Sequence, residues 1–234
     1  MQLWQINNAI EGLCEDVEET ITSKSWHQMT EQEIVHELLL CILGSGVRYE
    51  VAVAYAIEIT SSKCLCAKNV NKPDFLEKNI SLILNNEVSN FWGGKSYKRY
   101  RYPNARASYI SSSYCNISEE FGSFKQFLKN GNTPSELRRI IVLNCPGIGP
   151  KQASHFLKNV GYSSELAILD RHIVKYMELV DSKNVSTYQL GRLDKYEEIE
   201  LRFIDSVKSF RYSVAIVDQA MWFVMRALGS EVAA

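Results

Sequence analysis

Two residues near the middle of the chain, Lys151 and Asp170, have the chemistry for a covalent reaction. Lys151 follows a Gly-Ile-Gly turn and a proline, which places it in the first turn of an expected helix. A lysine amine can attack an electrophilic carbon and form an imine, which neither water nor a serine hydroxyl can do. The amine must be uncharged to attack, and a helix N-terminus favours the uncharged form. A solvated surface lysine is the alternative that remains open.

Asp170 follows the apolar run AIL at 167–169 and precedes an expected helix that begins at Arg171. This position predicts an N-cap, whose carboxylate accepts hydrogen bonds from the first amides of the helix. Such donors keep a carboxylate ionised, and an ionised carboxylate can stabilise a developing positive charge or steer a proton transfer. A cap with no further role is the structural alternative.

Two short helices joined by a glycine turn would position Lys151. The run TPSE at 133–136 has a capping-box pattern with proline at the first helical position, so it predicts the start of the first helix. Pro146 biases the residue before it out of the helical region and ends that helix. Pro150 suits the first turn of the second helix, and Gly161 suits its end. The sequence therefore predicts a helix-hairpin-helix over residues 134–160.

The hairpin between these helices predicts a contact with phosphate. Gly147, Ile148 and Gly149 precede the second helix, and their small or flexible backbone leaves amides uncovered at a helix N-terminus. Such amides bind phosphate without regard to base sequence. A plain structural turn is the alternative, because Gly-x-Gly between two helices is a weak signal alone.

Cations gather in a second stretch, residues 91–114, where FWGGKSYKRYRYPNARASYISSSY interleaves them with tyrosines. No acidic residue lies between Glu87 and Glu119. Phosphate neutralisation by such a patch makes binding salt-dependent, and tyrosines can stack on unpaired bases. A solvated basic loop with inward-facing tyrosines is the alternative, and Asn104 is expected to cap the helix that follows. The predicted DNA-binding cations are Lys95, Lys98, Arg99, Arg101 and Arg106.

Helical periodicity runs through most of the chain. The run TEQE at 30–33 is another capping box, followed by an apolar face that includes Ile34 and Leu38. Gly44 and Gly46 end that helix in a turn between helices. A last helix over 213–228 carries Asp218 and Trp222 one turn apart on a shared face. No strand pattern persists, so we predict an all-α fold.

Composition and cysteine usage set further limits. The chain has 234 residues, a formal net charge of −1 and six cysteines, which suit a reducing compartment better than a disulfide scaffold. Cys64 and Cys66 are too closely spaced for the usual zinc pair, and no cysteines follow Cys145 to hold an iron–sulfur cluster. No apolar run approaches the ~20 residues of a membrane span, and no signal peptide is apparent. We expect a cytoplasmic protein with no metal, no cofactor and no membrane contact.

The run PGIGPKQASHFLKNVGY…LAILDRHI resembles the helix-hairpin-helix signature of the DNA glycosylase superfamily. It is most similar to the archaeal-type (type 2) 8-oxoguanine DNA glycosylase/lyases. The resemblance implies that Lys151 is the nucleophile and Asp170 the essential carboxylate. It also implies an active-site cleft between two helical subdomains, residues 1–30 with 136–234 and residues 31–135. In that family a late Asp-x-x-x-Trp helix faces the flipped base, which gives Asp218 and Trp222 the role of base binding.

The implied function is bifunctional DNA glycosylase/AP lyase activity in base excision repair. The substrate would be double-stranded DNA with 8-oxoguanine or a related base, the enzyme a monomer, and the intermediate a Schiff base that ends in β-elimination. Family members usually end in a lysine whose carboxylate helps to read 8-oxoguanine, whereas this chain ends in EVAA, so the base stays open. A glycosylase for a different modified base is one alternative. A non-enzymatic helix-hairpin-helix DNA-binding protein is another, and it would require neither Lys151 nor Asp170.

Overall fold

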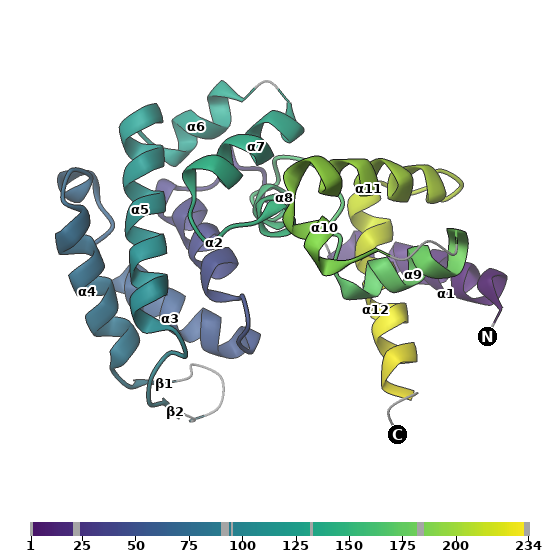
Figure 1. Cartoon of the computed structure of the whole chain (residues 1–234), viewed down its shortest axis with the longest axis horizontal. Helices are drawn as coiled ribbons and strands as arrows, with labels where there is room; N and C mark the ends of the chain where they lie inside the picture. The colour runs from purple at the N-terminus through teal and green to yellow at the C-terminus, as the bar shows by residue number, and fades with distance from the viewer. Residues whose placement is uncertain are drawn as a thin grey trace. The chain divides into compact units, whose positions relative to one another are not determined.

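The computed structural model describes residues 2–20, 24–89, 94, 96–131, 133–181 and 185–231 (Figure 1). Within these ranges the chain forms helices α1 to α12 and a single two-stranded antiparallel ladder. The ladder pairs β1 (Val88–Ser89) with β2 (Ser96–Tyr97), and strands this short show no alternation in sequence. The prediction of an all-α fold is confirmed apart from this small ribbon.

Contacts divide the chain into two compact units. Unit 1 combines Met1–Lys24 with Gly149–Ala234, and unit 2 is Ser25–Ile148. The boundary therefore falls inside the hairpin. The subdomains expected from the resemblance, residues 1–30 with 136–234 and residues 31–135, divide the chain at other positions and stay a prediction, as does the cleft between them.

Unit 2 is a bundle in which α4 runs beside α5 and α2 packs against α3. Its first helix, α2, begins as expected, because Thr30 and Glu33 form a reciprocal capping box. The helices of unit 2 are α2 (Glu31–Leu43), α3 (Tyr49–Ser61), the 3₁₀ helix η1 (Ala67–Asn69), α4 (Pro73–Asn85), α5 (Pro103–Phe121), α6 (Phe124–Asn130) and α7 (Pro134–Asn144).

The expected cap at the start of α5 is wrong. Pro103 is the first helical residue, so Asn104 lies inside the first turn and Tyr102 takes the N-cap position without a side-chain cap. The amide oxygen of Asn104 instead accepts from the Ser81 hydroxyl at 3.1 Å. Proline suits the first helical position because its missing N–H has no partner there, and this preference determines where the helix begins.

Unit 1 forms its core where α12 packs against α1 and α9. Fully buried side chains from all of these elements meet there, among them Ile10, Ile173 and Val217. The helices of unit 1 are α1 (Leu3–Thr20), α8 (Pro150–Asn159), α9 (Arg171–Asp181), α10 (Thr187–Gly191), α11 (Leu193–Ser206) and α12 (Val214–Glu231). None of the described helices is both long enough and apolar enough to cross a bilayer.

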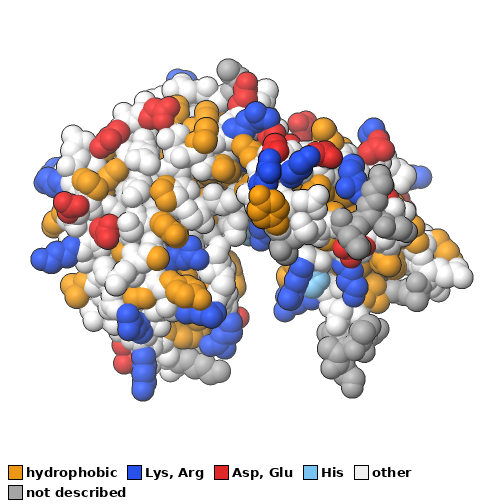
Figure 2. All heavy atoms as spheres, viewed as in Figure 1, with side chains coloured by type: hydrophobic (Ala, Val, Ile, Leu, Met, Phe, Trp, Pro, Cys, Tyr) orange, Lys and Arg blue, Asp and Glu red, His pale blue; other side chains and the backbone are white. Residues whose placement is uncertain are grey.

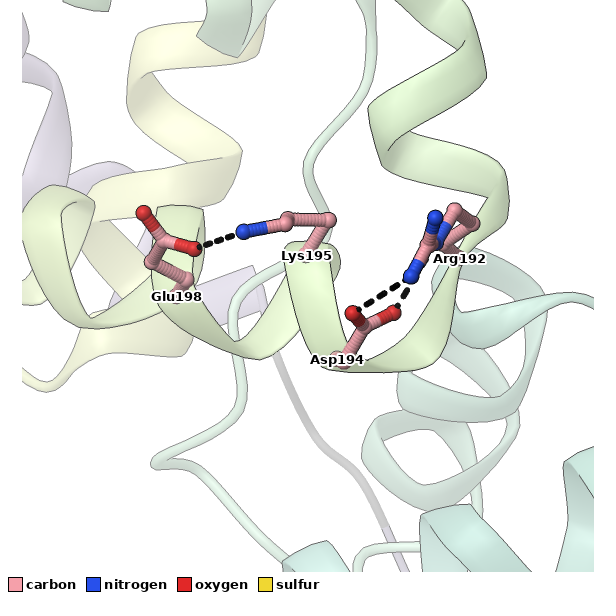
Figure 3. A network of polar contacts seen from close by, with 4 residues as sticks. All are labelled: Arg192, Asp194, Lys195 and Glu198. Carbon is pink, nitrogen blue, oxygen red and sulfur yellow. Dashed lines mark hydrogen bonds and ion pairs between the residues drawn. The ribbon is translucent and has the colours of Figure 1, made fainter.

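Helix α11 has two contrasting faces. Its solvent face carries ion pairs between Arg192 and Asp194 at 2.9 Å and between Lys195 and Glu198 at 2.8 Å (Figure 3). Such exposed pairs contribute little to stability because water and salt screen them. Its inner face buries Tyr196 together with Ile199, Phe203 and the carboxylate of Glu200, which is only 5% exposed.

Candidate active site and nucleic-acid interface

The hairpin at 145–149 is closed by its own backbone. Helix α7 ends where the Cys145 N–H donates to the Ile141 carbonyl, and the Ile148 N–H donates back to the Cys145 carbonyl at 3.1 Å. Gly147 has a φ of +78°, and Gly149 is the extended N-cap of α8 with no side-chain cap. Within the described chain, no group accepts from the amides of Gly147 and Gly149. The predicted phosphate site therefore rests on these two amides.

Tyr109 of α5 packs directly against the hairpin. A Cβ added to Gly147 would lie 2.3 Å from Cδ2 of the Tyr109 ring. The guanidinium of Arg106 covers the same ring at 5.6 Å from its centroid. Glycine is therefore required at position 147 for two reasons. Its φ is positive, and the Tyr109 ring fills the space that a Cβ would occupy.

Two of the predicted DNA-binding cations are engaged within unit 2. Arg106 donates to the Ser45 carbonyl and Arg101 to the Gly46 carbonyl, each at 3.1 Å, so both hold the turn between α2 and α3. Arg106 is half-buried, and its Nε is buried without an acceptor in the described structure. Their role in DNA binding stays a prediction.

Two of the remaining predicted cations are exposed to solvent. Lys98 and Arg99 are exposed beside β2, and Lys95 lies outside the described residues. Figure 2 shows Lys and Arg side chains gathered on unit 2 at the end where Figure 1 places the β1–β2 ribbon. This end of unit 2 thus offers open cations to a polyanion.

In unit 1, Asp170 is held at the start of α9. Its Oδ1 accepts from the backbone N–H groups of His172 at 2.8 Å and Ile173 at 3.1 Å. Its own carbonyl accepts the first helical bond, from the Val174 N–H at 2.9 Å. The predicted N-cap is therefore confirmed, and Asp170 stays half-exposed beyond it.

The extended segment 166–170, which leads into Asp170, has no strand partner in the described structure. Its three amides at positions 167, 168 and 169 donate in turn to Glu200 Oε1 (3.0 Å), Asp218 Oδ2 (2.8 Å) and the Tyr196 hydroxyl (3.0 Å). The Tyr196 hydroxyl donates back to the carbonyl at position 167, at 2.8 Å. Side chains of α11 and α12 thus replace the neighbouring strand that a buried extended segment usually requires.

Asp218 is almost fully buried, with 3% of its surface exposed. Burial raises the pKa of its carboxyl to about 7, although the Lys158 cation and the Ile168 amide oppose this rise in pKa. The negative charge of Asp170 raises the pKa of Asp218 further and the positive charge of Lys151 lowers it. Lys151 and Asp170 therefore each lie within electrostatic reach of Asp218 in unit 1.

Lys151 is the second residue of α8 and is half-buried. One turn further along, burial and then the cations Lys151 and Lys158 lower the pKa of His155 to about 4. His155 is therefore neutral at neutral pH. The Lys158 ammonium donates to the Ala215 carbonyl at 2.9 Å, which ties α8 to α12.

Trp222 lies beside the start of α9. Its ring meets the His172 imidazole edge-on, with 6.0 Å between centroids, and the Arg226 guanidinium lies 4.8 Å from its centre. Arg226 is exposed and has no acidic partner among the described residues. The Trp222 ring and the exposed Arg226 cation therefore lie near the start of α9, the helix that Asp170 caps.

Sequence analysis missed three residues of this site. Tyr196 and Glu200 lie four positions apart on an amphipathic helix, a spacing that indicates only a shared face. Arg226 follows Trp222 by one turn and resembles any solvated arginine. The one available signal was a charged residue, Glu200, on the apolar side of its helix.

Comparisons with known proteins find similar sequences and a similar fold. A family model described as 8-oxoguanine DNA glycosylase matches residues 17–212. A Metallosphaera sedula protein named 8-oxoguanine DNA glycosylase/AP lyase is 30% identical over 145 residues, which are 61% of this chain and 67% of that protein. A Saccharolobus solfataricus protein of the same name is 32% identical over 126 residues, 53% of this chain and 59% of that protein. The matched stretches thus span about three fifths to two thirds of these relatives.

A solved structure covers nearly the whole chain. The Methanocaldococcus jannaschii 8-oxoguanine glycosylase/lyase, in complex with a 15mer DNA containing 8-oxoguanine, matches with a TM-score of 0.65 and 24% sequence identity. The match covers 94% of this chain and 96% of that one. At this identity the likeness shows a shared fold.

Proposed function

This chain belongs to the 8-oxoguanine DNA glycosylase family, and we propose that it is a bifunctional DNA glycosylase/AP lyase acting on double-stranded DNA with an altered base. The observation that carries the proposal is the grouping in unit 1. The charges of both Lys151 and Asp170 affect the pKa of the buried Asp218, so the candidate nucleophile and the candidate carboxylate each lie near this residue of α12. The relatives from Metallosphaera and Saccharolobus carry the same activity in their names.

In the proposed reaction, the Lys151 amine attacks C1′ of a nucleotide turned out of the duplex. The C1′–N bond breaks, the base leaves with the bonding electrons and takes up a proton, and the amine loses one. Opening of the sugar ring gives a protonated imine. Removal of a C2′ proton then expels the 3′ phosphate by β-elimination, and water hydrolyses the imine to restore the lysine.

Asp170 supports the positive charge that develops on the sugar. Its Oδ1 accepts two amide hydrogen bonds, so the carboxylate has a fixed direction before substrate arrives. A charge that needs no reorientation stabilises a transition state more than a mobile one does. The cap and the catalytic role are compatible, because the carboxylate has a second oxygen.

We assign base binding to the α12 face that carries Asp218 and Trp222. The Arg226 guanidinium lies over the Trp222 ring, so a base can stack only on the part of the indole that this cation leaves open. Asp218 Oδ2 already accepts from the Ile168 amide, which leaves Oδ1 for a donor on the base. 8-Oxoguanine has an N7–H that guanine lacks, and such a donor fits a carboxyl oxygen as acceptor.

DNA backbone binding is assigned to the hairpin amides and the open cations. Gly147 and Gly149 would donate to phosphate, and Lys98 and Arg99 would neutralise it, with Lys95 as a further candidate. We also propose that the enzyme works as a monomer in the cytoplasm. Its catalytic and base-binding candidates belong to one unit of one chain, and six cysteines in a chain of this length suit a reducing compartment.

Borohydride trapping tests the proposal. Wild-type protein mixed with duplexes that carry 8-oxoguanine, other modified bases or a pre-made abasic site should become covalently attached to DNA under borohydride, because borohydride reduces the imine. Lys151→Gln should abolish trapping and base release while duplex affinity stays within about twofold, since no phosphate contact is removed. Lys175→Gln, which changes an exposed lysine of the same unit, is the matched control and should trap normally.

The same assay separates the alternatives. A glycosylase for another modified base would trap on that duplex and on the abasic site, but not on 8-oxoguanine. A non-enzymatic DNA-binding protein would bind every duplex and trap on none. Trapping of Lys151→Gln at the wild-type level would refute the assigned nucleophile.

A further inference from the structure

We propose that Tyr196 and Glu200, two buried residues of α11, are positioning residues for Asp170. They hold the backbone of segment 166–170 and through it the carboxylate at the end of that segment. This inference rests on the proposed function, in which Asp170 takes part in catalysis. Neither residue approaches the reacting atoms through the contacts described, so each would act only through Asp170.

The first argument is the hydrogen bonding of the segment. Buried backbone N–H groups require partners, and an unsatisfied one destabilises a protein by about 1–3 kcal/mol. Here three successive amides obtain partners only from side chains, two of which belong to α11. The course of the segment therefore depends on where α11 places a hydroxyl and a carboxylate.

The second argument is the two-sided contact of Tyr196. Its hydroxyl accepts from the Leu169 N–H at 3.0 Å and donates to the Ala167 carbonyl at 2.8 Å. One oxygen therefore fixes two peptide groups on either side of position 168. The Tyr196 ring is fully buried, so the hydroxyl has little freedom to follow a moving backbone.

The third argument is the presence of a carboxylate where an apolar residue would pack. Glu200 is 5% exposed on a helix face otherwise made of apolar and aromatic residues. Burial of a charged group is unfavourable unless hydrogen bonds compensate for it. Its Oε1 accepts from the Ala167 N–H at 3.0 Å. The ion pairs of the same helix lie on its exposed face (Figure 3), so Glu200 is the acidic residue directed at the segment.

The last step connects the segment to the carboxylate. The Asp170 N–H donates to the Ile168 carbonyl at 2.7 Å, which closes a tight turn at the end of the segment. The side chain is then held from the other direction by the first amides of α9. A shift of segment 166–170 would therefore tilt Asp170 against α9, and misplacement by about 1 Å can reduce a rate by about 100-fold.

The test uses the full-length protein and single-turnover assays. Tyr196→Phe removes the hydroxyl and keeps the ring, and Glu200→Leu removes the acceptor and keeps the volume. Each should slow base release and abasic-site cleavage roughly 10- to 100-fold. The dissociation constant for a duplex with a non-cleavable abasic analogue should stay within about twofold, because no DNA contact changes. Glu200→Gln retains an amide acceptor and should restore most of the rate.

Two controls measure what a merely structural loss would do. Tyr176→Phe removes a buried tyrosine hydroxyl that donates to Asn7 Oδ1 at 2.9 Å, away from the segment. Glu198→Gln removes an exposed ion pair of α11. Both variants should keep the wild-type rate, and the melting temperature of Tyr176→Phe calibrates the loss of one buried hydroxyl.

The double variant Tyr196→Phe/Asp170→Asn decides the matter. A residue that acts through Asp170 loses its effect once the carboxylate is absent, so the double variant should be about as slow as Asp170→Asn alone. Equal fold-losses in both backgrounds, or a wild-type rate for Tyr196→Phe and Glu200→Leu, would overturn the inference while Asp170→Asn remains slow. A wild-type rate for Asp170→Asn would instead refute the proposed role of Asp170, and the inference with it.

Discussion

The hairpin at 145–149 leads into the helix that carries Lys151, and the segment 166–170 ends at Asp170, but the two stretches obtain their shapes in different ways. The hairpin closes on itself through a hydrogen bond between Ile148 and Cys145 and a positive φ at Gly147. The segment has no such internal closure over positions 167 to 169. Its amides reach acceptors that lie 27 to 50 positions away in sequence.

The difference shows what determines the position of each candidate catalytic residue. A turn made of proline and glycine can form locally, because those residues restrict φ or permit its positive values. The course of the segment depends on its contacts with side chains of α11 and α12. Lys151 therefore depends mainly on local sequence, whereas Asp170 depends on the tertiary structure of unit 1.

The largest expected effect comes from the end of the segment. Asp170→Asn keeps a competent N-cap but removes the charge, so single-turnover base release should fall by roughly 100- to 1,000-fold. The melting temperature should change little, because asparagine caps helices about as well as aspartate. A rate loss accompanied by an equal loss in Asp170→Ser, with both proteins strongly destabilised, would favour the cap as the whole role.

Variants of Asp218 can separate two roles, binding of the base and the hydrogen bond that holds segment 166–170. Asp218→Asn keeps an oxygen for the Ile168 amide, so it should reduce base release by roughly 10-fold or more and leave abasic-site cleavage within about twofold. Asp218→Ala removes that oxygen as well, so both activities should fall and base release should fall further. Parallel losses in Asp218→Asn would show that Asp218 serves the segment or the chemistry rather than the base.

Gly147 tests the locally determined hairpin. Gly147→Ala places a Cβ against the Tyr109 ring and forces alanine into a left-handed conformation, which together should destabilise the protein by about 1–3 kcal/mol. Duplex affinity should fall several-fold as the amides move. Gly149→Ala is the matched control for stability, since its added Cβ meets only the flexible Gln152 side chain at 3.7 Å. Equal melting temperatures for both variants would contradict this account.

The smallest expected effect is a pair of opposite pH dependences in unit 1. Burial raises the pKa of Asp218 from 3.8 to about 7, so the folded protein keeps a proton that the unfolded chain loses, and stability falls as pH rises through this window. Burial lowers the pKa of His155 from 6.5 to about 4, so its contribution to stability increases with pH between those values. Each slope is limited to about 1.4 kcal/mol per pH unit.

Denaturation from pH 4 to pH 7 measures both slopes. Relative to wild type, Asp218→Asn should make stability rise more steeply with pH, because a term that falls with pH is removed. His155→Gln should make it rise less steeply, for the opposite reason. Variants whose curves run parallel to wild type would show that neither group titrates in the window described.

Sequence reasoning succeeded where structure is local. It placed the capping box at Thr30, the start of α8 at Pro150 and the N-cap at Asp170, each of which depends on a few neighbouring residues. It failed where a partner lies far along the chain. Arg101 and Arg106 donate to carbonyls 55 and 61 positions away, contacts that the cationic stretch does not reveal, and their role in DNA binding stays a prediction.

The same distance explains the missed residues of the site. Tyr196 and Glu200 show their role only through contacts with segment 166–170, and nothing in α11 itself identifies those contacts. The recognised motif at 143–173 contains both candidate catalytic residues but not the acceptors that fix one of them. A sequence signature can therefore identify a family without including the residues that hold a candidate catalytic side chain in place.

The contacts that hold segment 166–170 have a consequence for how this protein can diverge. They go to the peptide groups of the segment, and a peptide group is the same whichever side chain it bears. Ala167, Ile168 and Leu169 can therefore be exchanged for other apolar residues of similar volume without loss of a hydrogen bond. The constraint on substitution falls instead on Tyr196, Glu200 and Asp218, so variation tolerated in the segment is not tolerated in the helices that hold it.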